Sequence, residues 1–297
     1  MLEIKNIFKL YNSTTVLNNI SFSIAKGKIF GIIGPNGAGK TTTLRIILNI
    51  INPTSGEILF NQKKIDHSFL NKTGYLPEER GLYPKSKMKD VLIYFAKLKG
   101  LNKSLAEEKS YYWIKKLNLE NYIHYNVDEL SKGNQQKVQF ISAIIHDPEI
   151  IILDEPFSGF DPVNQSIFRE IINDFKNEKY IILSTHLMDL AQSLCEDIFL
   201  INNGKEVISG NLNSVLNSNN STIYEMRTTN YFEVKVYAQK LGVKITQINK
   251  NYYNVYLGSF SPSEFLRSFS KTVDIVEFKS VQPTLNQKFL ELINKNQ

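Results

Sequence analysis

The sequence GPNGAGKTT, which runs from Gly34 to Thr42, decides the fold of this chain. It follows an apolar run, Ile29–Ile33, of the kind that forms a short strand buried on both faces. After Lys40, apolar residues recur at helical spacing until Asn52-Pro53 ends the pattern. Glycine, four residues and then Gly-Lys-Thr, between a buried strand and a helix, is the pattern of a phosphate-binding loop. The stretch therefore predicts an α/β fold with a nucleotide site.

The residue types in this loop suit a polyphosphate ligand. Glycines let the backbone curve around the phosphates, and the N–H groups at the helix start point toward anionic oxygens. Lys40 supplies a positive charge for the β and γ phosphates, and the Thr41 hydroxyl can ligate Mg²⁺. We expect the nucleotide contacts of the loop to come from Asn36, Gly37, Ala38, Gly39, Lys40, Thr41 and Thr42.

A second apolar run, Ile150–Leu153, ends in the carboxylate pair Asp154 and Glu155. Parallel sheets bind their ligands at the carboxyl ends of the strands, so we expect this pair beside the phosphate loop. Asp154 suits the Mg²⁺ shell, directly or through water. Glu155 is the candidate base for the attacking water.

The composition excludes several classes of protein. The chain has 297 residues, 42% of them hydrophobic, and a net charge of +6, which is typical of a folded globular protein. Its one cysteine, Cys195, excludes an intramolecular disulfide framework and is compatible with a reducing cytosol. No apolar run approaches the roughly 18–20 residues that span a bilayer. The first residues lack the pattern of a signal peptide, so secretion is not expected.

The chain is expected to divide into two parts at residues 211–222, where a stretch rich in Asn and Ser predicts a linker. Before the linker, Asn203-Gly204 between two apolar runs predicts a β-hairpin. After it, the order strand, helix, strand, strand, helix, strand and a final helix predicts a small α+β domain. From residue 216 onward there are 10 Lys+Arg against 6 Asp+Glu, so most of the positive charge belongs to this second part.

The segment Leu130–Gln136, LSKGNQQ, resembles the signature sequence of ATP-binding cassette ATPases, whose usual form is Leu-Ser-Gly-Gly-Gln. Lys132 replaces the first glycine and Asn134 the glutamine, whereas Ser131 and Gly133 remain. With a serine as N-cap, this helix start can form a second anion-binding site that faces a γ-phosphate. The resemblance implies nucleotide contacts from Ser131, Lys132 and Gly133.

Further motifs follow in the order of the cassette family, and the resemblance gives each of them a role. Tyr11 lies where the family stacks an aromatic ring on adenine, with Val16 nearby. Asp161 belongs to a segment similar to the D-loop, which crosses the dimer interface beside the nucleotide. His186 resembles the switch histidine that contacts the γ-phosphate. The other histidines match no motif and are expected to be structural or exposed to solvent: His67, His124 and His146.

The chain departs from the family at the Q-loop, where the segment Gly74–Arg80 carries Glu78 instead of the usual glutamine. A glutamate still offers an oxygen to Mg²⁺, but it adds negative charge beside the triphosphate. Either this charge slows the engagement of ATP, or Arg80 or Lys87 offsets it, and the sequence leaves both possibilities open. Glu78 is therefore an expected contact of both the nucleotide and Mg²⁺.

The resemblance to the cassette family covers residues 1–215. It implies a P-loop NTPase fold, with a mixed sheet as its core and a helical subdomain at about residues 78–145. Residues 216–297 look like the small α+β accessory domain of bacterial sodium and drug export cassettes. This domain either regulates the cassette or extends an interface with a second cassette or a membrane partner.

The resemblance also implies a mechanism with ATP and Mg²⁺ as cofactors. Two cassettes dock head to tail, with each ATP between the phosphate loop of one chain and Ser131–Gly133 of the other, as a homodimer or as a pair with a homologue. Hydrolysis, with Lys40, Glu155 and His186 as the catalytic residues, then loosens the pair and moves a separate transmembrane permease subunit. The protein is expected to be cytoplasmic, peripheral on the inner face of the cell membrane, and to drive export.

Two other functions fit the motifs less well. Cassette ATPases that act on ribosomes or nucleic acid carry two cassettes or a long coiled coil, and Glu78 and Ser131 are too close for such an insertion. A nucleic-acid partner is therefore not expected. A regulator that binds ATP without turnover is conceivable from three departures, Glu78, Lys132 and Asn134. The intact catalytic set argues against it: Lys40, Asp154, Glu155 and His186. The transported substrate stays open, because the transport pathway belongs to the permease.

Overall fold

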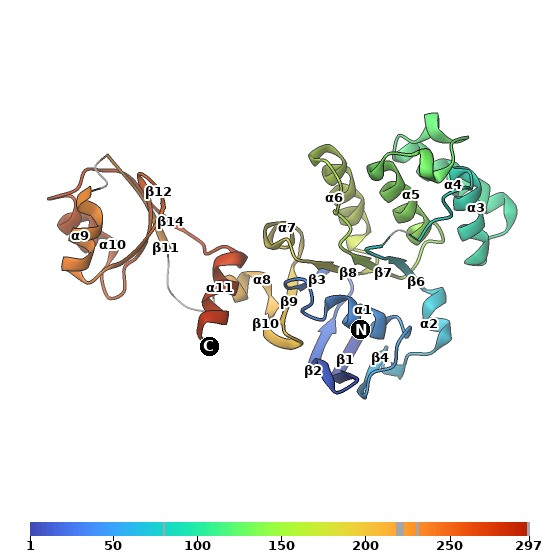
Figure 1. The fold of residues 1–297 in the computed structure, drawn as a ribbon, viewed down its shortest axis with the longest axis horizontal. Coiled ribbons are helices and arrows are strands. Elements are labelled where there is room, and N and C mark those ends of the chain that lie inside the picture. The colour runs from blue at the N-terminus through green and yellow to red at the C-terminus, as the bar shows by residue number, and fades with distance from the viewer. Residues whose placement is uncertain (80, 218–222, 230–231, 296–297) are drawn as a thin grey trace. The chain divides into compact units, whose positions relative to one another are not determined.

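A computed structural model describes residues 1–79, 81–217, 223–229 and 232–295 of the chain (Figure 1). The chain divides into two compact units, Met1–Leu212 and Asn213–Gln297, and each is built on sheets of its own. Within the described ranges no helix combines the length and the apolar character needed to cross a membrane.

The first unit contains a six-stranded sheet of order β10-β9-β3-β8-β7-β6. Its strands are β3 (Ile29–Ile33), β6 (Thr73–Leu76), β7 (Ile150–Asp154), β8 (Tyr180–Thr185), β9 (Asp197–Asn202) and β10 (Lys205–Asn211). The pairs from β6 to β9 are parallel, and β10 is antiparallel to β9. Strands β3, β7 and β8 are buried along their whole length, which confirms the buried strands predicted from the apolar runs at Ile29–Ile33 and Ile150–Leu153.

A smaller antiparallel sheet of order β2-β1-β4-β5 completes the core of the first unit. Its strands are β1 (Leu2–Tyr11), β2 (Thr14–Ile24), β4 (Ser55–Phe60) and β5 (Lys63–Lys64). Aromatic rings join the two sheets, since the Phe22 ring lies 5.1 Å from that of Phe30 and 4.6 Å from that of Phe199. Each large apolar side chain buried in this way contributes about 1.5–3 kcal/mol to the free energy of unfolding.

Helices surround the larger sheet. They are α1 (Lys40–Ile47), α2 (His67–Asn71), α3 (Met88–Leu98), α4 (Lys103–Lys116), α5 (Lys132–Ile144), α6 (Pro162–Lys176) and α7 (Met188–Leu194), with 3₁₀ turns η1 (Glu120–Tyr122) and η2 (Val127–Glu129). Helices α3, α4 and α5 form one group, as the sequence predicts for the segment before the second buried strand (Figure 1). Helix α1 ends before the predicted stop at Asn52-Pro53, because Asn49 already has a positive φ of 54°.

The second unit is an antiparallel sheet of order β12-β13-β11-β14. Its elements are β11 (Ile223–Thr228), α9 (Phe232–Leu241), β12 (Lys244–Asn249), β13 (Tyr252–Tyr256), α10 (Pro262–Phe269), β14 (Ile275–Val281) and α11 (Leu285–Lys295). Helices α9 and α10 cover one face of this sheet, where Ala238 and Phe265 share a core with Tyr253 (Figure 1). The observed order of elements is the predicted one; the predicted starts at Thr222 and Tyr231 lie outside the described residues.

The predicted linker is wrong in its first half. Instead of a loop, residues Leu212–Asn217 form helix α8 directly after β10. Leu212, Val215 and Leu216 are buried, and their spacing is that of one helix face. The Asn and Ser residues between them concealed this short apolar stripe. Residues 218–222 of the predicted linker lie outside the described residues.

The turn between β9 and β10 supports the phosphate loop. Asn203 and Gly204 have φ values of 47° and 71°, which suit the predicted two-residue hairpin turn. The Gly204 N–H donates to the Ala38 carbonyl at 2.9 Å, and the Gly204 carbonyl accepts from the Asn18 N–H at 2.8 Å. A Cβ at Gly204 would overlap the carbonyl oxygen of Val16. The hairpin is confirmed, and its glycine is required twice, by conformation and by space.

Replacing Gly204 with alanine is expected to lower the free energy of unfolding of the first unit by about 2–5 kcal/mol, from a strained φ and an overpacked contact. Gly27→Ala is the matched control, because Gly27 has a φ of 85° but open space around its Cβ position. The control should lose only about 1–2 kcal/mol. The single tryptophan, Trp113, lies in α4, so its fluorescence during urea unfolding reports on this unit. Equal losses in the two variants would contradict the steric argument.

Candidate functional site

The loop between β3 and α1 has the geometry of a phosphate cradle. Gly37 and Gly39 have φ values of 77° and 108°, and α1 begins directly after them. A Cβ at Gly39 would lie 2.7 Å from Leu17 Cδ2, so glycine is required there. Asn36 and Gly37 are exposed, whereas Ala38 and Gly39 are buried against the hairpin side of the sheet. A glycine loop that leads into a helix start is a geometry that suits an anion.

The Lys40 side chain folds back over this loop. Its ammonium donates to the carbonyls of Gly34 at 2.9 Å and Pro35 at 3.2 Å, and only 6% of the residue is exposed. The same ammonium lies 3.5 Å from Oε1 of Glu155. Lys40 is therefore a buried cation whose present partners are loop carbonyls and one carboxylate. Phosphate oxygens can replace the carbonyls without desolvating the ammonium further.

Asp154 is the last residue of β7, and its carboxylate is almost completely buried. Ser184 Oγ donates to its Oδ1, and the Thr41 hydroxyl lies near enough to favour the charged form of the carboxylate. Its Oδ2 is buried without a partner. Burial raises the pKa of Asp154 above its usual value, and the charge of Glu155 adds to the effect. An added cation would remove this cost.

These oxygens fit Mg²⁺. A hydroxyl and a carboxylate in contact, with one carboxylate oxygen unsatisfied, are hard ligands of the kind that Mg²⁺ takes together with substrate phosphates. In the described part of the chain, no group of three or more His, Cys, Asp or Glu could hold a metal by itself. The donor set therefore suits a metal that arrives with a phosphate ligand, not a closed protein site.

Glu155 is brought together with Lys40 and His186 by three loops that follow β7, β3 and β8. Its Oε2 accepts from Thr185 Oγ1 at 3.1 Å, and its Oε1 accepts from the His186 backbone N–H at 2.9 Å. The His186 Nδ1 atom is also 2.9 Å from Oε1. Glu155 has a φ of 48°, a conformation that costs roughly 1–3 kcal/mol in a residue other than glycine and that concentrates at functional sites.

Ser131 and Asp161 lie at the starts of two helices. Ser131 Oγ accepts from the Asn134 N–H at 3.2 Å and caps α5, where Lys132 is exposed. Asp161 accepts from the Asn164 N–H at 2.9 Å and caps α6, and these hydrogen bonds lower the pKa of Asp161. Among the described residues, no hydrogen bond or ion pair joins either cap to Lys40 or to the carboxylates of β7.

The chain itself does not require the glycine at position 133. Gly133 does not have a positive φ, and the nearest atom to a Cβ built on it is Asn164 Nδ2 at 3.7 Å, an ordinary contact. The backbone at this position is half-buried, with Asn164 and Phe160 of the same chain at ordinary contact distance from a Cβ built there, so neither conformation nor space within the chain explains the glycine.

Tyr11 and Val16 lie on the two strands of the β1–β2 hairpin. The Tyr11 ring is 44% exposed, with the Lys9 ammonium 4.7 Å from its centroid. Val16 is half-buried, and its carbonyl oxygen lies near Gly39 and Gly204. The structure thus places Val16 against the phosphate loop and leaves the Tyr11 ring accessible.

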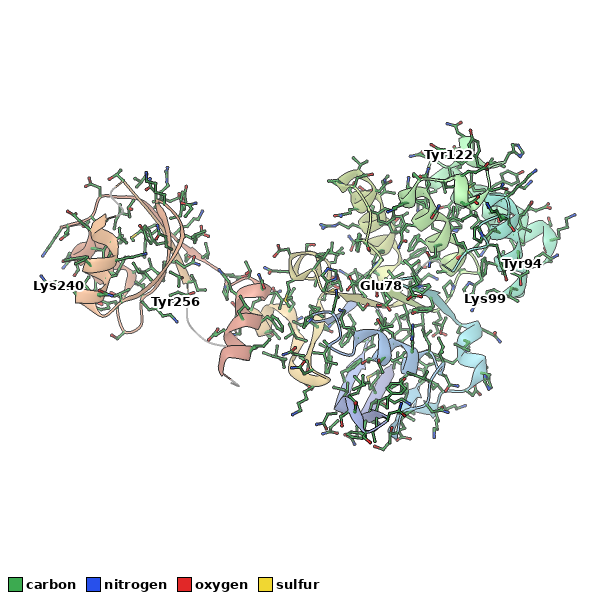
Figure 2. All side chains as sticks on the ribbon, in the orientation of Figure 1. Glu78, Tyr94, Lys99, Tyr122, Lys240 and Tyr256 are labelled. Carbon is green, nitrogen blue, oxygen red and sulfur yellow. The ribbon has the colours of Figure 1, made fainter. Side chains whose placement is uncertain are left out.

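Glu78 is exposed on the segment that leaves β6 (Figure 2). The carbonyls on either side of it, of Pro77 and Glu79, accept hydrogen bonds from Gln139 Nε2 at 3.2 and 2.9 Å. Sequence reasoning missed Gln139, and it also missed Ser184 and Thr185 as partners of the two carboxylates. For Gln139, the sequence signal that could have been used is a polar residue at a position of helix α5 where apolar residues surround it. Arg80 lies outside the described residues.

The three remaining histidines are confirmed as structural or exposed. His67 and His124 are exposed. Burial, with the nearby charge of Lys99, lowers the pKa of His146 to about 4, so this side chain is neutral at physiological pH. Among the described residues, no hydrogen bond or ion pair of Glu155 involves any of these three histidines.

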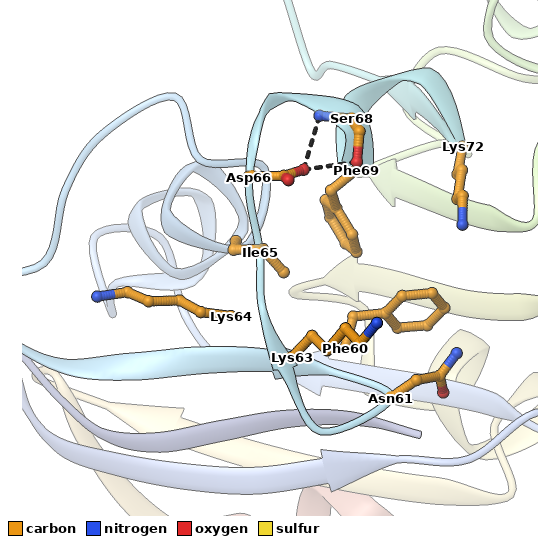
Figure 3. A pocket seen from close by; sticks show the side chains of 9 residues that line it. All are labelled: Phe60, Asn61, Lys63, Lys64, Ile65, Asp66, Ser68, Phe69 and Lys72. Carbon is orange, nitrogen blue, oxygen red and sulfur yellow. Dashed lines mark hydrogen bonds between the residues drawn. The ribbon is translucent and has the colours of Figure 1, made fainter.

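A surface cavity of about 310 Å³ lies apart from these residues, between the β4–β5 hairpin and α2 (Figure 3). Phe60 and Phe69 form its apolar part, and Ser68 donates twice to Asp66 at its rim. None of the residues that the sequence assigns to a nucleotide lines it. The cavity therefore does not belong to the site at the strand ends.

Comparison with known proteins agrees with the site. The family model described as ABC transporter matches residues 17–158. The uncharacterized ABC transporter ATP-binding protein YhaQ of Bacillus subtilis is 37% identical, over 99% of this chain and 98% of the relative. MJ1023 of Methanocaldococcus jannaschii, named in the same way, is 46% identical over 72% of this chain and 79% of the relative.

Two further similarities concern a named transport protein and a solved structure. The lantibiotic transport ATP-binding protein SrtF of Streptococcus pyogenes is 33% identical, over 76% of this chain and 100% of the relative. A solved ATP-binding subunit of an ABC transporter matches with a TM-score of 0.68 and 29% identity, over 73% of this chain and 92% of that one.

Asp154→Asn is expected to raise the free energy of unfolding at neutral pH. Because the pKa of Asp154 is raised above 3.8 in the folded state, folding is penalised once the carboxyl ionises, and an amide removes that penalty. The gain should therefore appear above about pH 4 and vanish near pH 3, where both states are protonated. Urea unfolding without nucleotide or Mg²⁺, from pH 3 to 8, measures it.

Asp66→Asn is the control of opposite sign. Hydrogen bonds from Ser68 lower the pKa of Asp66, so this variant should lose stability as the pH rises above about 4. If Asp154→Asn also loses stability at neutral pH, the argument that Asp154 carries an unrelieved burial cost is wrong.

Proposed function

The chain belongs to the ATP-binding proteins of ABC transporters, and we propose that it hydrolyses ATP with Mg²⁺ at the site formed by Lys40, Asp154, Glu155 and His186. As a member of this family it is an ABC ATPase. One observation carries the proposed assignment of roles: Lys40 and His186 both lie within 3.5 Å of the Glu155 carboxylate, although Lys40 begins α1 and His186 follows β8.

Each residue has a separate task in this proposal. Lys40 exchanges the carbonyls of Gly34 and Pro35 for phosphate oxygens. Thr41 and Asp154 hold Mg²⁺, which when bound neutralises charge on the phosphates. Asn36, Gly37, Ala38, Gly39 and Thr42 contribute the rest of the cradle.

Glu155 receives the proton of the attacking water. Its carboxylate is buried and oriented by the Thr185 hydroxyl and the His186 N–H, so it does not reorganise when the water loses its proton. His186, held at Oε1, is placed to contact the γ-phosphate.

The helix start at Ser131–Gly133 is proposed to serve the nucleotide of a second cassette. Two observations support this: no bond among the described residues joins the segment to the phosphate loop, and the glycine is not required by its own chain. Lys132 there and Asp161 at the neighbouring cap would face the same nucleotide. The protein would thus act as a homodimer or beside a homologue, with Tyr11 and Val16 on adenine.

We propose a transmembrane permease as the partner that the cassette moves. The surface of α3 supports a docking site, since Tyr94 and Leu98 are 47% and 65% exposed beside a hollow of about 460 Å³. Figure 2 labels Tyr94 on this helix. A transport role is supported by relatives such as the lantibiotic transport protein. The proposed direction, export, follows the resemblance of residues 216–297 to the accessory domain of export cassettes. The protein would then be cytoplasmic and peripheral on the inner face of the cell membrane, with residues 1–215 as the cassette and 216–297 as an accessory domain.

Glu155→Gln is expected to leave ATP binding intact, to lower the turnover by about 10²–10⁴-fold and to trap an ATP-bound dimer. Glu149→Gln is the matched control, because Glu149 precedes the opposite end of β7. Phosphate release with Mg·ATP and gel filtration measure the two effects. Turnover at the wild-type rate in Glu155→Gln would remove Glu155 from the role of base.

Deleting residues 216–297 is expected to leave the affinity for ATP unchanged, because every proposed nucleotide contact lies before residue 187. A fluorescent ATP analogue measures the affinity, and Trp113 fluorescence checks that the cassette is folded. Lys40→Ala in the full chain is the reference for lost binding. If the folded deletion variant does not bind, the proposed domain boundary is wrong.

A further inference from the structure

Helix α5 buries two glutamines on one face. Gln136 and Gln139 are each 3% exposed and are one helical turn apart. A buried side-chain amide is costly unless its hydrogen-bonding groups are used, so its partners indicate why it is there. Gln136 Nε2 reaches the carbonyl of Pro156, directly after Glu155, at 3.4 Å. Gln139 reaches the other loop of the site.

Gln139 bridges the residues on both sides of Glu78. Its Nε2 donates to the Pro77 carbonyl at 3.2 Å and to the Glu79 carbonyl at 2.9 Å. Both partners are acceptors, so only the amide nitrogen can face them, and this settles the orientation of the amide. Gln139 Oε1 is buried without a partner. Both N–H groups of the Gln139 amide therefore donate to the backbone of the segment Pro77–Glu79.

We propose that Gln139 is the positioning residue for Glu78: it ties the backbone on both sides of Glu78 to helix α5. The inference rests on the ATPase function proposed above and on the expectation from the sequence that Glu78 contacts the nucleotide and Mg²⁺. Glu78 itself is exposed, and among the described residues no ion pair involves it, so its own side chain does not hold the loop. The order of this loop comes from the two carbonyls that flank the residue.

The bridge links three parts of the site through one rigid element. Helix α5 starts at the Ser131 cap, contacts Pro156 after one turn and holds Pro77 and Glu79 after the next. A shift of the helix start therefore carries the loop of Glu78 with it. The position of a carboxylate beside the triphosphate has to be controlled, because its charge repels the phosphates unless a metal ion lies between.

The test is a double-mutant cycle between Gln139→Met and Glu78→Ala in the full-length chain. Methionine keeps the length and apolar packing of the side chain and removes the donors. We expect Gln139→Met to lower kcat about fivefold to tenfold while KM for ATP stays within about twofold, because the Lys40 loop is untouched. The double variant should be no slower than Glu78→Ala alone, since Gln139 acts through Glu78.

Ser142→Ala is the matched control. Ser142 lies one turn further along α5, and its hydroxyl donates only to the Gln139 carbonyl of its own helix. This variant should turn over at the wild-type rate. Multiplicative losses in the cycle, which indicate independent effects, or a wild-type kcat in Gln139→Met, would overturn the proposal.

Amide hydrogen exchange separates failure of this inference from failure of the proposed function. Exchange in residues 75–79 should be faster in Gln139→Met than in Ser142→Ala or wild type, whether or not the protein turns over ATP. A wild-type chain without Mg²⁺-dependent hydrolysis would contradict the proposed function alone. Unchanged exchange in Gln139→Met would contradict the bridge.

Discussion

The buried contact between Lys40 and Glu155 depends on the register of three parallel strands. Strand β8 lies between β3 and β7 and pairs Thr185 with Ile33 and Ser184 with Asp154. Because the three strands end level, the loops after them meet at one edge of the sheet. That edge holds every group placed within 3.5 Å of Glu155. A slip of one residue in either pairing would move the carboxylates to the other face.

The same edge gathers charge that is costly to bury. For Glu155 this cost is reduced by the neighbouring Lys40 and His186. Asp154 has a hydroxyl partner at one carboxylate oxygen and no hydrogen-bond partner at the other. The raised pKa of Asp154 records the remaining cost. The unbalanced charge at the site therefore lowers the free energy of unfolding, as is common in proteins where a bound ligand balances the charge. The left-handed backbone conformation of Glu155 also lowers the free energy of unfolding.

The supports of the loops come from positions that carry no motif. Gly204 of the β9–β10 turn donates to Ala38 in the phosphate loop, and Gln139 of α5 holds the segment around Glu78. Sequence reasoning found the hairpin but not what it touches, and it missed Gln139 altogether. It also took residues 211–217 for part of a linker, because a single turn of apolar residues inside polar ones gives little periodic signal.

Local patterns of residues were sufficient to predict the local chemistry: the phosphate loop between a strand and a helix, the carboxylates at the end of an apolar run, and the order of elements in the second unit. These follow from short-range patterns, in which neighbouring residues set backbone conformation and burial. Only the tertiary structure decided which groups meet. In the folded chain the Thr185 hydroxyl donates to Glu155, one carboxylate oxygen of Asp154 has no hydrogen-bond partner, and Gln139 donates to the carbonyls on either side of Glu78. Such contacts join residues more than 25 positions apart, and their partners depend on strand register and helix packing, which no local pattern encodes.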